Sequence, residues 1–215
     1  MHHITMYLDF VSPYAWLAFQ QLPTTLQGLS CHVEYRPVLL GALLQQNGNP
    51  GPAGIPAKRI WTYRHVEWLG QHLGVPLQMP AQHPFNPLPL LRLALQTSHD
   101  GSINRFVAET LFRHVWEGGA NALDTARLEQ LQLRLQTLLH TDTDTDAVSQ
   151  AKQWLRSNTE QASAQGVFGA PAFAVQGEVF WGLDSLPMLR DFLDGHAWFH
   201  TSAWENAKSI PSGLA

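Results

Sequence analysis

Strand patterns occur only near the two ends of this 215-residue chain, and this distribution constrains the fold more than any other feature. Residues 4–10 alternate apolar and polar side chains, which predicts a half-buried strand. Ser12 and Pro13 follow, a pair favoured at the N-cap and the first position of a helix, and helical spacing continues to Pro23. Residues 31–38 predict a second strand. The opening is therefore expected to form a right-handed parallel βαβ unit.

The middle of the chain predicts helices only. Residues 43–54 are rich in Gly, Pro and Asn, so we expect a loop there. Beyond this loop, apolar side chains recur at intervals of three and four residues. The predicted helices span residues 57–73, 88–96, 103–116, 125–139 and 147–165. The second of these is apolar nearly all round, which predicts a buried helix.

The last part of the chain returns to strands. Two short apolar runs flank Gln176-Gly177, a two-residue hairpin turn, and a closing helix is expected from about Ser185 or Pro187. Without the helical block, the element order is that of a thioredoxin fold. We therefore predict an α/β chain with a thioredoxin-like fold and a large all-helical insertion. The expected parts are residues 1–45 with 166–200 (a discontinuous thioredoxin-like domain), 46–165 (the inserted helical domain) and 201–215 (a C-terminal tail).

Composition excludes several classes of function. Charged residues make up 14% of the chain, the formal net charge is −4, and the three lysines and ten arginines form no cluster, so we expect no nucleic-acid partner. The apolar runs are too short to span a bilayer and no secretory signal precedes the first strand, so we expect a cytoplasmic protein without a membrane partner. Cys31 is the one cysteine, so no intrachain disulfide can form. His196 and His200 have chelating spacing but no third ligand, and we expect no metal.

Ser12-Pro13-Tyr14-Ala15 is the first candidate site. A helix N-terminus offers unpaired N–H groups and a partial positive charge, which stabilise anions, thiolates included. Redox enzymes with this fold place C-x-x-C there, whereas this chain has Ser12 and Ala15 at the two cysteine positions. Dithiol chemistry is therefore excluded. On this segment alone, Ser12 is more simply read as a helix cap.

Two further segments could complete a site around Ser12. Ala170-Pro171 stands just before the hairpin, where a cis proline of a thioredoxin fold would face the first helix, and Ala170 would offer its backbone to an extended peptide. The alternative is a plain turn. Asp184, after Gly182 and Leu183, could bind the ammonium of a zwitterionic ligand, or it could cap the last helix.

These segments resemble the 2-hydroxychromene-2-carboxylate isomerases, which are similar to the kappa-class glutathione transferases and belong to the DsbA-like branch of the thioredoxin superfamily. The resemblance covers the chain up to the last helix. It is carried by residues 9–15 (DFVSPYA), 36–41 (RPVLLG), 54–59 (GIPAKR), 85–89 (FNPLP), 166–171 (GVFGAP) and 180–184 (FWGLD).

The resemblance implies glutathione as a cofactor that is not consumed. Ser12 would be the catalytic residue, with its hydroxyl donating to the glutathione sulfur and favouring the thiolate. Ala170, with Pro171, would pair with the cysteinyl backbone of glutathione, while the Leu183 backbone and Asp184 would hold its γ-glutamyl end. Asn49 lies where kappa-type enzymes have an asparagine near the sulfur, in a loosely matched loop.

The resemblance also implies a substrate and a reaction. The thiolate of bound glutathione would add reversibly to an aromatic enone and so interconvert 2-hydroxychromene-2-carboxylate and trans-o-hydroxybenzylidenepyruvate, as in naphthalene degradation. Lys58 is a candidate partner of the substrate carboxylate, and Phe85, Leu88 and Trp181 could line an aromatic pocket. A homodimer is implied as well. The alternatives are a kappa-class-like transferase that conjugates glutathione to electrophiles, and a non-catalytic thioredoxin-fold binding protein.

Overall fold

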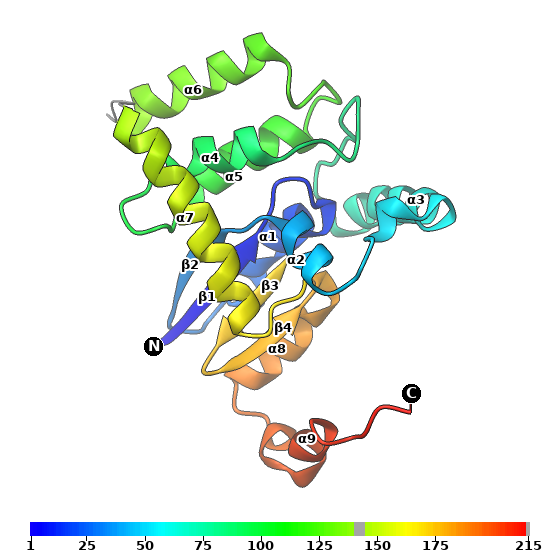
Figure 1. Cartoon of the computed structure of the whole chain (residues 1–215). Coiled ribbons are helices and arrows are strands. Elements are labelled where there is room, and N and C mark those ends of the chain that lie inside the picture. Colours follow the sequence, from blue (N-terminus) through cyan, green and yellow to red (C-terminus); the bar gives the residue numbers. More distant parts are fainter. Residues whose placement is uncertain (140–144, 214–215) are drawn as a thin grey trace.

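The computed structural model describes residues 1–139 and 145–213 and is centred on one mixed four-stranded sheet (Figure 1). Its strands lie in the order β2-β1-β3-β4. The two opening strands pair in parallel, and the two hairpin strands extend the sheet antiparallel to β1. The strand bounds are β1 (His2–Leu8), β2 (Cys31–Pro37), β3 (Ala172–Val175) and β4 (Glu178–Trp181). The predicted strands are therefore confirmed, with shifts of one or two residues at three of the ends.

Helices cover both faces of this sheet (Figure 1). α1 (Pro13–Thr25) and α8 (Leu186–Leu193) lie on one face and α7 (Thr145–Ala164) on the other. Alternate side chains of β1 point into two cores, because successive residues of a strand face opposite sides. Met6 and Leu8 belong to the larger core, beneath α1, whereas Tyr7 is buried in the smaller core with Ala162 of α7. The thioredoxin-like α/β fold is thus confirmed, and β1 is buried on both faces rather than on one.

Four helices of the middle block form a helical layer at one end of the sheet, the first of them to one side and the other three above it (Figure 1). They are α3 (Pro56–Leu73), α4 (Leu88–Leu95), α5 (Arg105–Trp116) and α6 (Thr125–Leu139), with a short 3₁₀ turn η1 (Pro52–Gly54) before α3. Five of the eight residues of α4 are buried, as its all-round apolar pattern predicted. The domain boundaries stay predictions: the first, at residue 45, falls inside α2 (Leu40–Gln46), and the second falls just after α7.

The first four residues of the segment predicted as a loop, 43–46, belong instead to the end of the helix α2 (Leu40–Gln46). The Gly, Pro and Asn residues that favour a loop start only at Asn47, and Leu43 before them is fully buried in the smaller core. The Leu40 N–H at the start of α2 donates to the carboxylate of Asp9, 2.9 Å away. The loop prediction was therefore wrong for the first residues of this segment, because a long-range hydrogen bond and a buried leucine stabilise a helical turn there.

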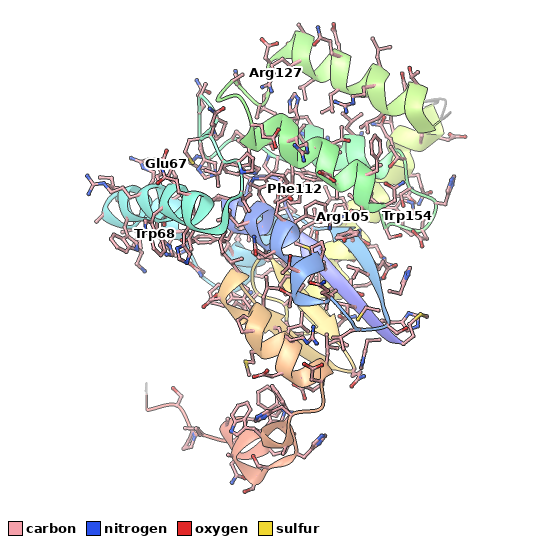
Figure 2. All side chains as sticks on the ribbon, turned by 180° about the vertical axis from the view of Figure 1, so that it is seen from behind. Glu67, Trp68, Arg105, Phe112, Arg127 and Trp154 are labelled. Carbon is pink, nitrogen blue, oxygen red and sulfur yellow. The ribbon has the colours of Figure 1, made fainter. Side chains whose placement is uncertain are left out.

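α1 continues two residues beyond its predicted end at Pro23. Proline has no N–H, so the carbonyl of Phe19, four residues earlier, loses its helical donor. The guanidinium of Arg105 on α5 replaces that donor: Nη1 and Nη2 each lie 3.4 Å from the Phe19 oxygen. The same group lies 4.1 Å above the Phe19 ring, and Figure 2 shows it beside α1. An arginine from the helical layer thus supports the last turn of α1.

The C-terminal tail folds against its own chain. After α8 come η3 (Ala197–His200) and α9 (Ser202–Ala207), at the bottom of Figure 1. The ring of Phe199 packs edge-on against Phe192 and Phe180, which anchors the tail to the end of the sheet. No helix within the described residues is long and apolar enough to cross a membrane.

Candidate functional site

Ser12 lies at the start of α1, in the loop that leaves β1. Its backbone is extended (φ −91°, ψ 114°) and its Oγ accepts a hydrogen bond from the Ala15 N–H, 3.2 Å away. Ser12 is therefore the N-cap of α1, which confirms the prediction of a helix cap. The same hydroxyl donates to the carbonyl oxygen of Ala170, also at 3.2 Å. The side chain is 5% exposed, so this polar group sits where the helix end, the loop before β3 and the core meet.

The loop before β3 faces this helix end through Ala170. The Ala170–Pro171 peptide bond is cis. Among the described residues, the Ala170 N–H has no hydrogen-bond partner. The pairing of β3 with β1 begins only at Ala172. The Pro171 carbonyl accepts a hydrogen bond from the Gly182 N–H at 2.9 Å, which brings the turn after β4 to the same edge of the sheet. Ser12, Ala170 and the segment from Gly182 are thus neighbours although they lie far apart in sequence.

Asp184 presents an exposed carboxylate near the first turn of α1. It belongs to the 3₁₀ turn η2 (Leu183–Ser185) and forms no ion pair within the described part of the chain. Burial raises the pKa of the Tyr14 hydroxyl, and the negative charge of Asp184 raises that pKa further. Tyr14 is held by a 2.9 Å hydrogen bond to Nδ1 of His65 on α3. The side chain of Leu183 packs against the larger core, which leaves its backbone as the group that a ligand could reach.

Asp9 is a buried carboxylate three residues before Ser12, and the sequence reasoning gave it no role. Its Oδ1 accepts from the Val11 N–H at 3.1 Å and its Oδ2 from the Leu40 N–H at 2.9 Å. It is fully buried without a cationic partner among its hydrogen bonds, and burial raises the pKa of this carboxyl to about 7. Asp9 therefore ties the loop that carries Ser12 to the start of α2. The apolar–polar alternation of residues 4–10 predicted that Asp9 faces solvent, so its burial was not expected from the sequence.

His83 is a second group that the sequence did not reveal. Its Nε2 donates to the Val11 carbonyl at 2.8 Å, and its carbonyl oxygen accepts from the Tyr63 hydroxyl at 2.6 Å. Burial lowers the pKa of this imidazole, so it is neutral at pH 7. The ring thus fastens the segment before α4 to the residue preceding Ser12. An isolated histidine in a Pro- and Gln-rich loop carries no sequence signal for such a contact.

The other predicted residues are dispersed around this centre. The Asn49 Oδ1 accepts from the Gly51 N–H at 2.9 Å, within its own loop, and Lys58 is exposed in the first turn of α3. Phe85 packs against the His83 ring, with centroids 6.2 Å apart. Leu88 lines a cavity between α2, α4 and α7. Trp181, which is 52% exposed, packs on Phe168 with ring centroids 4.9 Å apart.

This arrangement suits an anionic sulfur ligand with a peptide-like backbone. The N-terminus of α1 supplies partial positive charge and the Ser12 hydroxyl supplies a donor. The free N–H of Ala170 can pair with an extended peptide, and Asp184 can pair with an ammonium group. Cys31 begins β2, away from this helix end, so no protein dithiol is available. Within residues 1–139 and 145–213, no three side chains of the metal-binding types come together.

Comparisons with known proteins identify the family of this chain. A family model described as a DSBA-like thioredoxin domain matches residues 3–194. The chain is 30% identical over 203 residues to a 2-hydroxychromene-2-carboxylate isomerase of Sphingobium xenophagum, with 88% of this chain and 97% of the relative covered. It is 23% identical over 217 residues to the glutathione S-transferase kappa 1 of Homo sapiens, with 91% and 92% covered.

A solved 2-hydroxychromene-2-carboxylate isomerase has the same fold, with a TM-score of 0.69 and 22% identity over 97% of this chain and 100% of that structure. The chain therefore belongs to the DSBA-like thioredoxin-domain family, in the group that holds the 2-hydroxychromene-2-carboxylate isomerases and the kappa-class glutathione transferases.

Proposed function

We propose that this chain is a glutathione-dependent cis-trans isomerase that interconverts 2-hydroxychromene-2-carboxylate and trans-o-hydroxybenzylidenepyruvate, or acts on a similar aromatic catabolite. One observation carries the proposal: the Ser12 hydroxyl caps α1 and faces the Ala170 carbonyl beside a cis proline, where redox relatives need a cysteine. A serine cannot form a disulfide, so the site is suited to hold a thiolate that arrives with a ligand. The isomerase relative at 30% identity supports this reading.

The residues present fit glutathione at each of its three functional parts. The Ser12 hydroxyl would turn from the Ala170 carbonyl to donate to a thiolate, and the N-terminus of α1 adds partial positive charge. Ala170, next to Pro171, offers to the cysteinyl backbone an N–H that has no partner among the described residues. Asp184 offers an exposed carboxylate to the γ-glutamyl ammonium, with the Leu183 backbone beside it. Asn49 would contact the sulfur through its Nδ2 amino group, since its Oδ1 accepts the Gly51 N–H within its own loop.

When bound, glutathione would supply a thiolate that adds to the conjugated double bond of the ring-opened substrate, so that the bond can rotate before the thiolate leaves. The Ser12 hydroxyl and the N-terminus of α1 hold negative charge on sulfur before the addition and receive it again afterwards. No protein proton is consumed over the cycle. Lys58 is proposed to pair with the substrate carboxylate from the exposed first turn of α3, and Phe85, Leu88 and Trp181 are proposed to contact the aromatic ring.

A kappa-class-like transferase is the second candidate, because the chain is also similar to kappa transferases over nine-tenths of its length. The same glutathione contacts would serve both reactions, and only the second substrate differs. A non-catalytic glutathione-binding protein is the third. A homodimer located in the cytoplasm is proposed with the isomerase.

The test follows the ultraviolet spectrum of 2-hydroxychromene-2-carboxylate with enzyme, in the presence and absence of catalytic glutathione. We expect conversion to the trans enone that requires glutathione and leaves the total thiol unchanged. Ser12→Ala should slow turnover by about a hundredfold or more, the usual cost of removing one preorganised donor. Ser149→Ala, at an exposed position of α7, is the matched control and should leave turnover unchanged.

Loss of thiol in proportion to product would contradict the isomerase proposal. Rapid conjugation of chlorodinitrobenzene without isomerisation would then support the transferase. Glutathione binding with neither activity would support the non-catalytic binding protein.

A further inference from the structure

α3 projects from the side of the molecule, as both views show (Figure 1, Figure 2). Of its 18 residues only Thr62, Val66 and Gly70 are buried, and they lie one helical turn apart along a single stripe. A surface helix that packs through one stripe ordinarily carries polar and charged side chains on the rest of its surface. The side of α3 away from this stripe departs from that pattern.

Large apolar side chains of α3 lie in solvent. Trp61 is 67% exposed, Trp68 55% and Ile60 53%. They share one side of the helix, because residues three or four positions apart are neighbours on a helix surface. The exposed residues of this side, here called the outer face, are Ile60, Trp61, Arg64, Glu67, Trp68 and Gln71. Exposed apolar side chains that gather in this way mark interaction surfaces, whereas singly scattered ones are ordinary.

The two tryptophans are held in place by their own neighbours. The ring of His65 stacks on both of them, with centroids 6.0 Å from Trp61 and 6.2 Å from Trp68 and interplanar angles of 12° and 11°. His72 stacks on Trp68 with centroids 4.9 Å apart, and the Tyr14 hydroxyl lies 2.9 Å from Nδ1 of His65. Ordering side chains at an interface costs free energy, so rings that are already stacked lose less on association. Tryptophan is also enriched among the residues that dominate interface energies.

The charged residues of the outer face complement a second copy of the same face. Arg64 and Glu67 are exposed, and neither forms an ion pair with any residue that the structure describes. Two α3 helices can run antiparallel about a two-fold axis level with residue 65. Arg64 then lies within about 1.5 Å, measured along the helix, of the level of the partner's Glu67. Trp61 lies equally close to the level of the partner's Trp68. One register therefore satisfies both the charges and the aromatic rings.

We propose that the outer face of α3 is the surface through which two copies of this chain associate, with the helices antiparallel, Arg64 paired with the partner's Glu67 and Trp61 packed on the partner's Trp68. The inference rests on the homodimer that is proposed with the isomerase activity, because it names the surface that forms this dimer. It does not use the chemistry of the Ser12 site.

Sedimentation equilibrium of the whole chain, over a range of concentrations, tests the surface. We expect the unmodified chain to form dimers. Arg64→Glu would set two carboxylates against each other in both ion pairs, and Glu67→Arg would do the same with two guanidinium groups. Each variant alone should raise the dissociation constant by about thirtyfold or more, as the loss of a dominant interface residue does. Arg134→Glu, at an exposed position of α6, is the matched control and should leave the constant unchanged.

An equimolar mixture of Arg64→Glu and Glu67→Arg tests the register. In a dimer with one copy of each variant, the new carboxylate faces the new guanidinium, and the original Glu67 of one copy faces the original Arg64 of the other. Both ion pairs are then restored. The mixture should therefore form dimers with a dissociation constant near that of the unmodified chain, which would also show that both variants fold.

The contrary outcomes are distinct. A dimer whose dissociation constant is the same in Arg64→Glu as in the unmodified chain would overturn this surface and leave the proposed homodimer standing. An unmodified chain that stays monomeric at every concentration would overturn both. Dissociation of each variant alone, without recovery in the mixture, would overturn the antiparallel pairing of Arg64 with the partner's Glu67.

Discussion

At the scale of single residues, the buried carboxylate of Asp9 organises the surroundings of Ser12. One oxygen accepts from the backbone N–H of Val11 in the Ser12 loop. The other accepts from the N–H of Leu40 in α2, which lies 31 residues further along the chain. Such hydrogen bonds favour the ionised carboxylate, whereas full burial disfavours it, and burial is the larger effect. Asp9 therefore titrates near neutral pH while it fastens the loop that carries the proposed catalytic hydroxyl.

The raised pKa of Asp9 predicts how stability depends on pH. An unfolded aspartate has a pKa of about 3.9, against about 7 in the folded chain. Between these values the folded state binds more protons, so the contribution of Asp9 is greatest below pH 4, falls as pH rises to about 7, and is constant above. The free energy of unfolding of the unmodified chain minus that of Asp9→Asn should fall across this window by up to about 1.4 kcal/mol per pH unit.

Urea unfolding of both proteins at a series of pH values measures this difference directly. Because the comparison is between two proteins at each pH, the titration of every other carboxylate cancels. A difference that stays constant between about pH 4 and pH 7 would show that Asp9 keeps an ordinary pKa.

At the scale of elements, α1 depends on a partner from the helical layer. Pro23 removes the helical donor to the Phe19 carbonyl, and Arg105 of α5 supplies another. The guanidinium also stacks over the Phe19 ring and donates a hydrogen bond to the Tyr35 hydroxyl at 3.1 Å. The helix that presents Ser12 at one end is thus joined at its other end to the inserted block.

A double-mutant cycle tests whether Arg105 replaces the hydrogen bond that Pro23 cannot make. Arg105→Met keeps the apolar stem and removes the charged donor, so it should destabilise the chain by about 1–3 kcal/mol. Pro23→Ala restores an N–H that can reach the Phe19 carbonyl. In the Pro23→Ala background, Arg105→Met should therefore cost about 1 kcal/mol less. Strict additivity of the two substitutions in urea unfolding would mean that Arg105 does not replace the missing donor.

The elements that local rules govern were predictable from the sequence. Ser12-Pro13 marked the start of α1, and Gln176-Gly177 marked the hairpin, because caps and tight turns depend on neighbouring residues. Asp9 and Arg105 were missed because their partners lie 31 and 86 residues away. The beginning of α2 was missed for the same reason, since its first N–H is bonded to Asp9.

At the scale of the whole molecule, the candidate site is assembled from three distant segments at one edge of the sheet. Ser12 and Ala170 are separated by 158 residues, and the Gly182–Pro171 hydrogen bond adds the turn that holds Asp184. No rule of sequence spacing predicts that these segments lie together. The prediction that they form one site came from the family resemblance. The helical layer lies above this edge, so a ligand at the site would be bordered by both parts of the fold (Figure 1).

The central claim is that this edge stabilises the thiolate of glutathione, and the pKa of the bound thiol tests it most directly. The thiolate ultraviolet band, recorded against pH, should show a bound thiol with a pKa below the ordinary value of about 8.5. Ser12→Ala should raise that pKa toward the ordinary value, while Ser149→Ala should leave it unchanged. A bound thiol with the same pKa in Ser12→Ala as in the unmodified chain would contradict the role assigned to Ser12.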